Sequence, residues 1–281
     1  MDVLGQCLQN GAVEDMSTRY KSVLSIAGSD SGGCAGIQAD IKSISANGAF
    51  AATVITATTA QNTQGVTDIH GIPPAHIEKQ LEAVLDDIEF GAVKIGMLHS
   101  VEVIETVKNT LARYNVGNII LDPVMVATSG DKLISEEAIE RLRSFLPNVY
   151  LITPNIPEAE ILLGRSISFE NIEASAKEIS NLFDVSVLLK GGHLAFKDEM
   201  TDVLFLKDEQ KIVVIKNKAI DTNHTHGTGC SLSSAIATHV SLGSSLEESV
   251  IKGCNYVNQA IVDGKDKILG KGNGPINHFG I

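Results

Sequence analysis

The stretch of sequence that decides the fold is Ser22–Ser45, which reads SVLSIAGSDSGGCAGIQADIKSIS. Its first part, Ser22–Ala27, is a short apolar run of the kind that forms a buried strand. A loop with four glycines follows, and the chain continues into Ile37–Ser45, where apolar residues recur at helical spacing. A strand that turns tightly into a helix is typical of parallel sheets covered by helices. The segment therefore predicts an α/β fold.

The remainder of the chain repeats this alternation of short strands and helices. Further strands are expected at residues 52–57, 92–95, 118–121, 149–153 and 185–189, and a hairpin at 202–206 and 212–216 is expected to end the sheet. Helices are expected along the apolar stripe Ile77, Leu81, Val84 and Ile88, after Ser100, Ser135 and Phe169, over residues 232–240, and from the capping box of Ser245 and Glu248 to about Val262. The pattern predicts one domain over residues 18–281, with a mostly parallel central sheet flanked by helices. Residues 1–17 show no clear periodicity and are expected to be a disordered tail or an expression remnant.

The composition favours a small-molecule partner. The 281 residues are 43% hydrophobic and 20% charged, which suffices for a large core and excludes a disordered or fibrous chain. A formal net charge of −12 disfavours binding to nucleic acid or to an anionic membrane. The sequence shows neither an apolar run long enough to span a membrane nor the layout of a secretory signal. We therefore expect a soluble cytoplasmic protein.

Cysteine and histidine spacing predicts neither a disulfide framework nor a metal centre. The four cysteines are too few and too widely spaced, and none of the eight histidines sits in a known ligand pattern. Each cysteine is therefore taken singly as a reduced thiol.

The strongest chemical signal is Thr225–Ser231, which reads THGTGCS and directly precedes a predicted helix. Glycines at a helix start expose backbone N–H groups, which together with the helix dipole bind a phosphate or a developing negative charge. The same field is expected to lower the pKa of Cys230 and make it a base or a nucleophile. The alternative is an inert, buried cysteine at a crowded helix start.

Three further strand ends carry charged or polar side chains. Asp122 closes one strand, and Asn155 and Glu158 follow the next one at the start of a helix. Oxygen ligands of this kind suit Mg²⁺, although Asn155 and Glu158 would equally serve as a helix cap. Lys190 ends another strand beside two glycines, where its cation could neutralise a polyphosphate.

Ring recognition is the remaining prediction from single residues. The amide of Gln61 could read the donor and acceptor edge of a heteroaromatic ring, and the sulfur of Met97 could pack on its face. The glycine loop at residues 27–36 is either a tight turn or a cradle for a small ligand. All these residues are expected at the carboxyl edge of one sheet, where open α/β sheets bind their ligands.

Nine segments, in order, resemble the ribokinase superfamily and more closely its vitamin-kinase branch, the hydroxymethylpyrimidine kinase/phosphomethylpyrimidine kinase family. They are residues 27–33 (AGSDSGG), 35–40 (AGIQAD), 59–63 (TAQNT), 94–98 (KIGML), 121–125 (LDPVM), 153–155 (TPN), 190–193 (KGGH), 225–230 (THGTGC) and 272–275 (GNGP). The resemblance covers nearly all of the chain from Lys21 to Phe279. It implies a ribokinase-like three-layer sandwich, a homodimer, and ATP and Mg²⁺ as cofactors. The implied reaction transfers the γ-phosphoryl group of ATP to 4-amino-5-hydroxymethyl-2-methylpyrimidine and then to its monophosphate, for thiamine biosynthesis.

The resemblance also implies a role for each site residue. The catalytic group would consist of Cys230 as the base, with Lys190, Gly227 and Gly229. Substrate would be bound by Gln61, by Asp40 near the hydroxymethyl group, and by Gly28, Ala35, Met97 and Val124 around the ring. The residues implied for ATP are Lys190, Asn155, Thr225, Gly227, Thr228 and Gly229. Asp122 and Glu158 would hold Mg²⁺, in part through water.

Three alternatives stay open at the level of sequence. Pyridoxal kinases share most of the sheet and the glycine loops, so a pyridoxal or pyridoxine kinase of vitamin B6 salvage is the second candidate. Chemistry with Cys230 as nucleophile and His226 or His193 as its partner is a hypothesis of another class. A non-catalytic ligand sensor on the same fold is the third.

Overall fold

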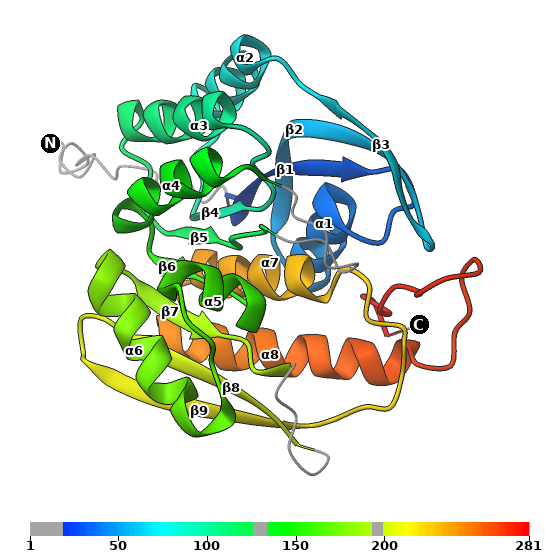
Figure 1. The fold of residues 1–281 in the computed structure, drawn as a ribbon. Coiled ribbons are helices and arrows are strands. Elements are labelled where there is room, and N and C mark those ends of the chain that lie inside the picture. The colour runs from blue at the N-terminus through cyan, green and yellow to red at the C-terminus, as the bar shows by residue number, and fades with distance from the viewer. Residues whose placement is uncertain (1–18, 126–133, 193–198, 281) are drawn as a thin grey trace, which may run out of the picture.

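One nine-stranded sheet forms the centre of the molecule (Figure 1). The computed structural model describes residues 19–125, 134–192 and 199–280, so the predicted tail at residues 1–17 lies outside the described residues. The strands are β1 Ser22–Asp30, β2 Phe50–Asn62, β3 Gly65–Gly71, β4 Ala92–Ile95, β5 Ile119–Leu121, β6 Leu151–Ile152, β7 Ser186–Leu189, β8 Glu199–Leu206 and β9 Lys211–Lys218, in the sheet order β3-β2-β1-β4-β5-β6-β7-β8-β9. Neighbouring strands from β2 to β7 are parallel, whereas β3, β8 and β9 pair antiparallel at the two edges. The predicted mostly parallel sheet is confirmed, and β9 ends it as expected.

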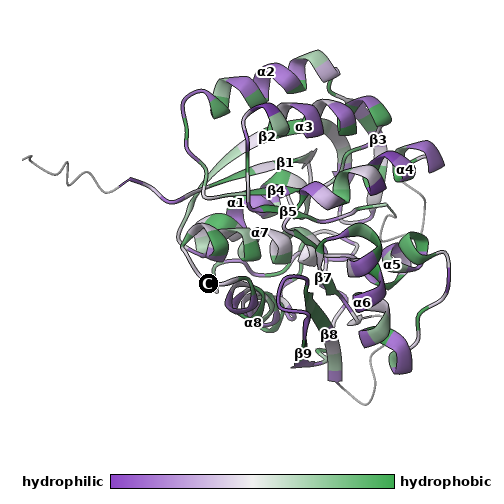
Figure 2. Cartoon of the chain, turned by 90° about the vertical axis from the view of Figure 1, so that its left-hand side faces the viewer, coloured by the Kyte–Doolittle hydropathy of each residue, from purple (hydrophilic) through white to green (hydrophobic). Residues whose placement is uncertain are grey.

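Helices cover both faces of this sheet. One face carries α2 Pro74–Leu85, α3 Val101–Arg113, α4 Glu136–Phe145, α5 Ile156–Leu163 and α6 Ile172–Phe183, and the other carries α1 Gly36–Ala46, α7 Thr228–Ser241 and α8 Leu246–Gly264. Short 3₁₀ turns at Leu146–Asn148 and Phe169–Asn171 follow α4 and precede α6. Each face has its own buried apolar cluster, and the hydrophobic colours of Figure 2 gather on the strands while the outer helices carry the hydrophilic ones. The architecture is therefore a three-layer sandwich.

Local capping chemistry sets several helix starts. The Ser100 side chain accepts a hydrogen bond from the Val103 N–H at the start of α3, as predicted. The predicted capping box of Ser245 and Glu248 starts α8, which ends at Gly264, two residues later than expected. The predicted helix over residues 232–240 begins earlier, because α7 already includes the glycine loop from Thr228.

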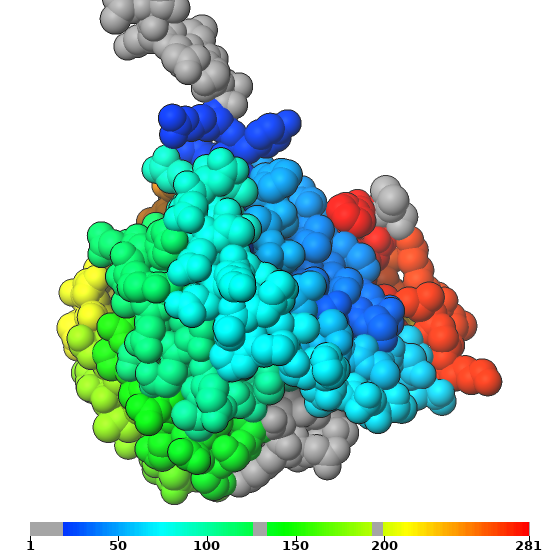
Figure 3. Space-filling view, turned by 90° about the horizontal axis from the view of Figure 1, so that it is seen from above, coloured from blue at the N-terminus to red at the C-terminus, as the bar shows by residue number. Residues whose placement is uncertain are grey.

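The strand β3 was not predicted from the sequence. It reads GVTDIHG, and its residues are exposed except for the last one, so it lacks the alternation that marks a half-buried strand. Its register comes from antiparallel pairing with the end of β2. The β2–β3 turn contacts the C-terminal segment, where the Gly272 N–H donates to the Thr63 hydroxyl at 3.1 Å. In Figure 3 the red C-terminal segment correspondingly lies on the same side of the molecule as the blue to cyan strands.

Candidate active site

The loop predicted to bind an anion, residues 225–231, lies at the start of α7 and is called the anion loop below. Gly227 has a φ of +85°, and a Cβ at this position would overlap the carbonyl oxygen of Cys34. Only glycine therefore lets this loop lie directly against the loop that follows β1. The helix has no side-chain cap, and within the described residues the N–H groups of Gly229 and Cys230 have no hydrogen-bond acceptor. Two unsatisfied donors at a helix start form a site for an anion.

Two residues of this loop differ in their accessibility. Thr225 is exposed, and its carbonyl accepts the N–H of Thr228 at 3.3 Å. Thr228 is the first residue of α7 and is partly buried. The contact of either residue with ATP stays a prediction.

Directly beneath the loop lies an ion pair from two strand ends. The Lys190 ammonium lies 2.9 Å from Asp122 Oδ1, and the same oxygen accepts the Thr153 hydroxyl at 2.9 Å. A Cβ placed on Gly229 would be 3.3 Å from Asp122 Oδ2 and 3.5 Å from the Lys190 Nζ. The anion loop is therefore seated on this pair, and it brings a cation and a carboxylate to the exposed N–H groups.

Glu158 completes the charge balance of this cluster. It is buried, and burial raises its pKa to about 7, an effect that Lys190 opposes and Asp122 reinforces. Burial alone would lower the pKa of Lys190, but the charges of Asp122 and Glu158 outweigh it and raise that pKa. Two carboxyl groups thus share a single lysine, and a cation such as Mg²⁺ could take the place of the proton that the raised pKa leaves on Glu158.

Asn155 has the capping role that the sequence left open. Its side chain accepts the Glu158 N–H at 2.9 Å, and Glu158 Oε2 accepts the Asn155 N–H at 2.8 Å. The capping box at α5 is therefore real, and it fixes the Glu158 carboxylate beside the Asp122–Lys190 pair. Capping and cation binding do not exclude each other for Glu158, since its other carboxylate oxygen takes no part in the box. The direct contact of Asn155 with ATP stays a prediction.

The prediction that the helix start lowers the pKa of Cys230 is wrong. Burial raises the pKa of this thiol to about 11. The ammonium of Lys94 lowers it, but the carboxylates of Asp40 and Asp122 raise it again. The N–H of Gly36 donates to the sulfur and makes only the smallest contribution. In the ligand-free protein Cys230 is therefore a protonated thiol at neutral pH.

Asp40 belongs to a buried network rather than to the surface of a substrate pocket. Its carboxylate oxygens both lie 2.8 Å from the Lys94 ammonium, and the two side chains are fully buried. The carboxylate oxygens of Asp40 also accept hydrogen bonds from the hydroxyls of Ser25 at 2.6 Å and Ser234 at 2.8 Å. Because the Asp40 carboxylate is fully buried and all of its acceptor positions are used, Asp40 cannot contact a substrate in this conformation. This corrects its predicted role to that of a positioning residue beneath Cys230.

A second group contains the residues predicted to contact the ring of the substrate. This group, called the ring wall below, consists of Gly28, Ala35, Gln61, Met97 and Val124. Gln61 Nε2 lies 3.2 Å from His226 Nε2, and Gln61 Oε1 accepts the Thr59 hydroxyl at 3.0 Å. Across the site, the Met97 side chain is close to the backbone of Gly28, since a Cβ added there would be 3.0 Å from Met97 Cε.

The ring wall is continuous with the anion loop. Ala35 and Val124 are both partly buried, and Ala35 lies in the loop that contacts Gly227. The structure thus brings the predicted ring residues and the anion loop to the same edge of the sheet.

Sequence reasoning missed three residues that shape this site. Lys94 lies inside a buried strand, and a lysine within such a run is itself a signal of a buried ion pair. Asp30, at the end of β1, accepts three backbone N–H groups and fixes the glycine loop. His226 was considered only as a partner of Cys230, whereas the structure places it beside Asp30 and Gln61. His193, the other proposed partner, lies outside the described residues.

None of the helices over the described residues is long and apolar enough to cross a membrane.

Comparison with known proteins identifies the family. The chain matches the phosphomethylpyrimidine kinase family over residues 30–277. It is 42% identical to the hydroxymethylpyrimidine/phosphomethylpyrimidine kinase of Haemophilus influenzae, over 93% of this chain and 98% of that protein. It is also 46% identical to the thiamine biosynthesis bifunctional protein of Geobacter sulfurreducens, over 92% of this chain but 52% of that protein. The chain thus spans about half the length or less of several curated relatives that it matches.

Solved structures place the fold in the same group. The phosphomethylpyrimidine kinase of Clostridium difficile superimposes with a TM-score of 0.75 at 42% identity, over 86% of this chain and 99% of that one. The pyridoxal kinase of Bacillus subtilis, solved as an ADP complex, gives a TM-score of 0.85 at 30% identity, over 92% of this chain and 98% of that one. With this fold and with a sequence match across most of its length, the chain belongs to the phosphomethylpyrimidine kinase family.

Proposed function

We propose that the chain transfers the γ-phosphoryl group of ATP to 4-amino-5-hydroxymethyl-2-methylpyrimidine and then to the resulting monophosphate. The observation that carries this proposal is the pair of free N–H groups of Gly229 and Cys230, seated on the Asp122–Lys190 ion pair. Phosphoryl transfer depends mainly on positioning and on electrostatic stabilisation, and this arrangement supplies both. The use of ATP is supported by the ADP complex of the similar pyridoxal kinase.

In the proposed transfer, each of these residues has a part. The hydroxymethyl oxygen attacks the γ-phosphorus, the bond to the bridging oxygen of ADP breaks, and the hydroxyl proton has to leave. The N–H groups of Gly229 and Cys230 stabilise the negative charge on the transferring group, and Lys190 adds a positive charge. Cys230 lies in the first turn of the same helix and accepts the proton in its thiolate form. In the second round the attacking atom is an oxygen of the monophosphate.

Asp122 and Glu158 are the residues that would hold Mg²⁺. The ion, when bound, screens the charge of the phosphate oxygens. The residues themselves fit this role because Lys190 pairs with Asp122, and a cation could take the place of the proton on Glu158. A cation paired with Asp122 also removes one of the charges that raise the pKa of Cys230. Burial remains the main cause of the raised pKa, so the Cys230 thiol has to lose its proton before it can act as the base.

The experiment that tests this function is a coupled ADP-release assay with Mg·ATP. The pyrimidine alcohol, its monophosphate and pyridoxal are offered separately under identical conditions. We expect turnover of the first two substrates. Turnover of none would favour the sensor hypothesis over the kinase.

Pyridoxal is the second candidate substrate, because the pyridoxal kinase structure superimposes with a TM-score of 0.85. Preference for pyridoxal in the same assay would assign the protein to vitamin B6 salvage. The assignments of the fold and of the phosphoryl-transfer site would not change. The cysteine-nucleophile hypothesis is disfavoured by geometry, since the His226 ring contacts Gln61 and not Cys230.

Gln61→Leu is expected to weaken binding of the pyrimidine. A buried ring amine that loses its partner costs about 1–3 kcal/mol, which corresponds to roughly 5- to 150-fold in Kd. Isothermal titration of the pyrimidine without nucleotide measures this loss. The matched control is Gln64→Leu, because Gln64 lies exposed in the adjacent turn. Equal affinity of Gln61→Leu and the unmodified protein would remove Gln61 from the pocket.

We also propose a homodimer, on the strength of the family resemblance. Sedimentation velocity of the full chain tests it, and a single species at the monomer mass would contradict it.

A further inference from the structure

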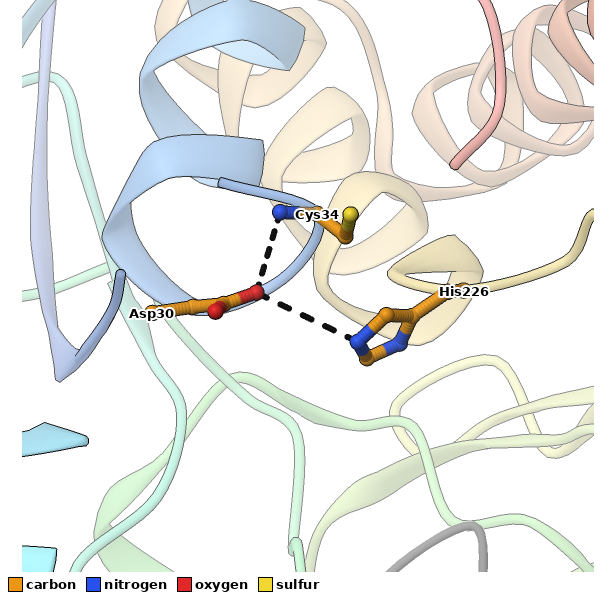
Figure 4. A group of neighbouring side chains, drawn as sticks. All are labelled: Asp30, Cys34 and His226. Atoms are coloured by element: carbon orange, nitrogen blue, oxygen red, sulfur yellow. Dashed lines mark hydrogen bonds and ion pairs between the residues drawn. The ribbon is translucent and has the colours of Figure 1, made fainter. Parts of the chain in front are cut away.

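Three potential metal ligands from distant parts of the chain meet beside the ring wall (Figure 4). They are Asp30 at the end of β1, Cys34 in the following glycine loop, and His226 in the anion loop. One ligand atom of each lies within 4.8 Å of the others, and His226 Nε2 is 3.9 Å from Asp30 Oδ2. Neither the kinase site nor the sequence pattern accounts for this cluster.

The Asp30 carboxylate is fixed in place before any ligand arrives. Oδ2 accepts the N–H groups of Cys34 at 2.9 Å and Ala35 at 2.8 Å, and Oδ1 accepts the N–H of Gly32 at 2.8 Å. The loop that carries the Cys34 sulfur is therefore folded around this carboxylate. A preorganised carboxylate and a sulfur on the same short loop reduce the conformational cost of binding an ion.

The third ligand is Nε2 of His226, whose lone pair accepts a hydrogen bond from Gln61. The Gln61 amide nitrogen can only donate, so at 3.2 Å it makes Nε2 of His226 the acceptor and leaves the proton on Nδ1. A neutral imidazole whose nitrogen accepts a hydrogen bond is the form that binds a metal ion.

We propose that Asp30, Cys34 and His226 form a binding site for a divalent transition-metal ion of the zinc class. A sulfur, a nitrogen and a carboxylate oxygen are ligands of Zn²⁺, which leaves a fourth position for water. Bonds of about 2.0–2.3 Å at tetrahedral angles place ligand atoms roughly 3.3–3.7 Å apart. Separations of up to 4.8 Å therefore have to shorten by at most about 1.5 Å to reach this. The Cys34 thiol gives its proton to solvent as the sulfur–metal bond forms, and the thiolate and carboxylate together neutralise the ion.

A metal ion at this position excludes the ring from its pocket, a consequence that rests on the proposed function. The ion takes the lone pair of His226 that now accepts from Gln61. Gln61 then loses its hydrogen bond to His226, and the ion lies at the ring wall, where the pyrimidine is predicted to bind. The site would make the enzyme sensitive to excess zinc, independently of the Mg²⁺ used with ATP.

The first experiment is a titration of the full chain with Co²⁺ in the absence of nucleotide, followed by absorption. We expect a thiolate-to-cobalt charge-transfer band that saturates at one equivalent and is bleached by Zn²⁺. Cys34→Ala should abolish the band, whereas Cys7→Ala, Cys230→Ala and Cys254→Ala should retain it. Circular dichroism shows whether each variant is folded. No band in the unmodified protein, or a band that survives Cys34→Ala, would overturn the proposal.

The second experiment separates the metal site from the proposed function. The pyrimidine is titrated into the protein by calorimetry, with and without one equivalent of Zn²⁺. We expect zinc to weaken its binding at least tenfold in the unmodified protein and to leave Cys34→Ala unaffected. Metal binding with unchanged pyrimidine affinity would overturn the competition but retain the metal site. Failure of the pyrimidine to bind at all would count against the proposed function, while the cobalt band would still decide the metal site.

Discussion

Replacing Cys230 with alanine is expected to lower kcat by about 10²- to 10⁴-fold, the usual contribution of a general base. Nucleotide binding should be largely retained, because Gly229 and residue 230 contribute backbone N–H groups that alanine keeps. ADP release under saturating substrate measures the rate, and calorimetry measures ATP affinity. The matched control is Cys254→Ala, since Cys254 is buried in α8 away from the anion loop. Unchanged turnover of Cys230→Ala would refute the base assignment.

The pKa of Cys230 makes a separate prediction about the ligand-free protein. Because burial raises that pKa to about 11, the thiolate is a small minority at neutral pH. Alkylation of Cys230 by iodoacetamide should therefore be slow at pH 7.5 and should accelerate about tenfold per pH unit toward pH 11. Mass analysis of the peptide that contains Cys230 gives the rate at each pH. A plateau reached below pH 8 would show that the helix start outweighs burial after all.

The strand and helix order could be predicted because burial leaves a periodic trace in sequence. β4 was predicted at residues 92–95 and observed at Ala92–Ile95, where all four residues are buried. The mostly parallel sheet flanked by helices follows from that order, whereas the ribokinase-like sandwich was implied by the family resemblance. β3 left no such trace, because its exposed residues owe their conformation to pairing with β2 and not to a core.

The site could be predicted in position but not in its electrostatics. Parallel strands end at one edge, so Asp122, Glu158 and Lys190 were correctly expected to meet there. The protonation of Cys230 depends on burial and on Asp40, a residue far from it in sequence. The same limit applies to Asp30 and His226, whose proximity depends on how two loops from opposite ends of the chain pack. Contacts between loops so far apart in the chain cannot be predicted from the spacing of residues in the sequence.

Lys94→Met is expected to reduce the free energy of unfolding by about 3–5 kcal/mol, because it leaves the Asp40 carboxylate buried without its cation. Lys94 and Asp40 are both fully buried, and the ammonium contacts both carboxylate oxygens at 2.8 Å. Urea unfolding followed by circular dichroism measures the loss. Lys177→Met is the control, since Lys177 is exposed on α6 and its removal should change stability by no more than about 0.5 kcal/mol.

The pH range over which this loss holds, and a double variant, test whether a buried ion pair is its cause. The pKa of Lys94 is raised: its burial alone would lower it, but the charge of Asp40 outweighs that effect. A lysine whose folded pKa exceeds its unfolded one stabilises the protein fully below the ordinary lysine pKa and loses that contribution only at strongly alkaline pH. The difference between Lys94→Met and the unmodified protein should therefore stay constant from pH 6 to pH 9. The double variant Lys94→Met, Asp40→Leu should recover much of the loss, because no unpaired charge remains buried. If the double variant were as unstable as Lys94→Met, the cost would come from lost packing, and Asp40 would not be the reason that a lysine is buried beneath Cys230.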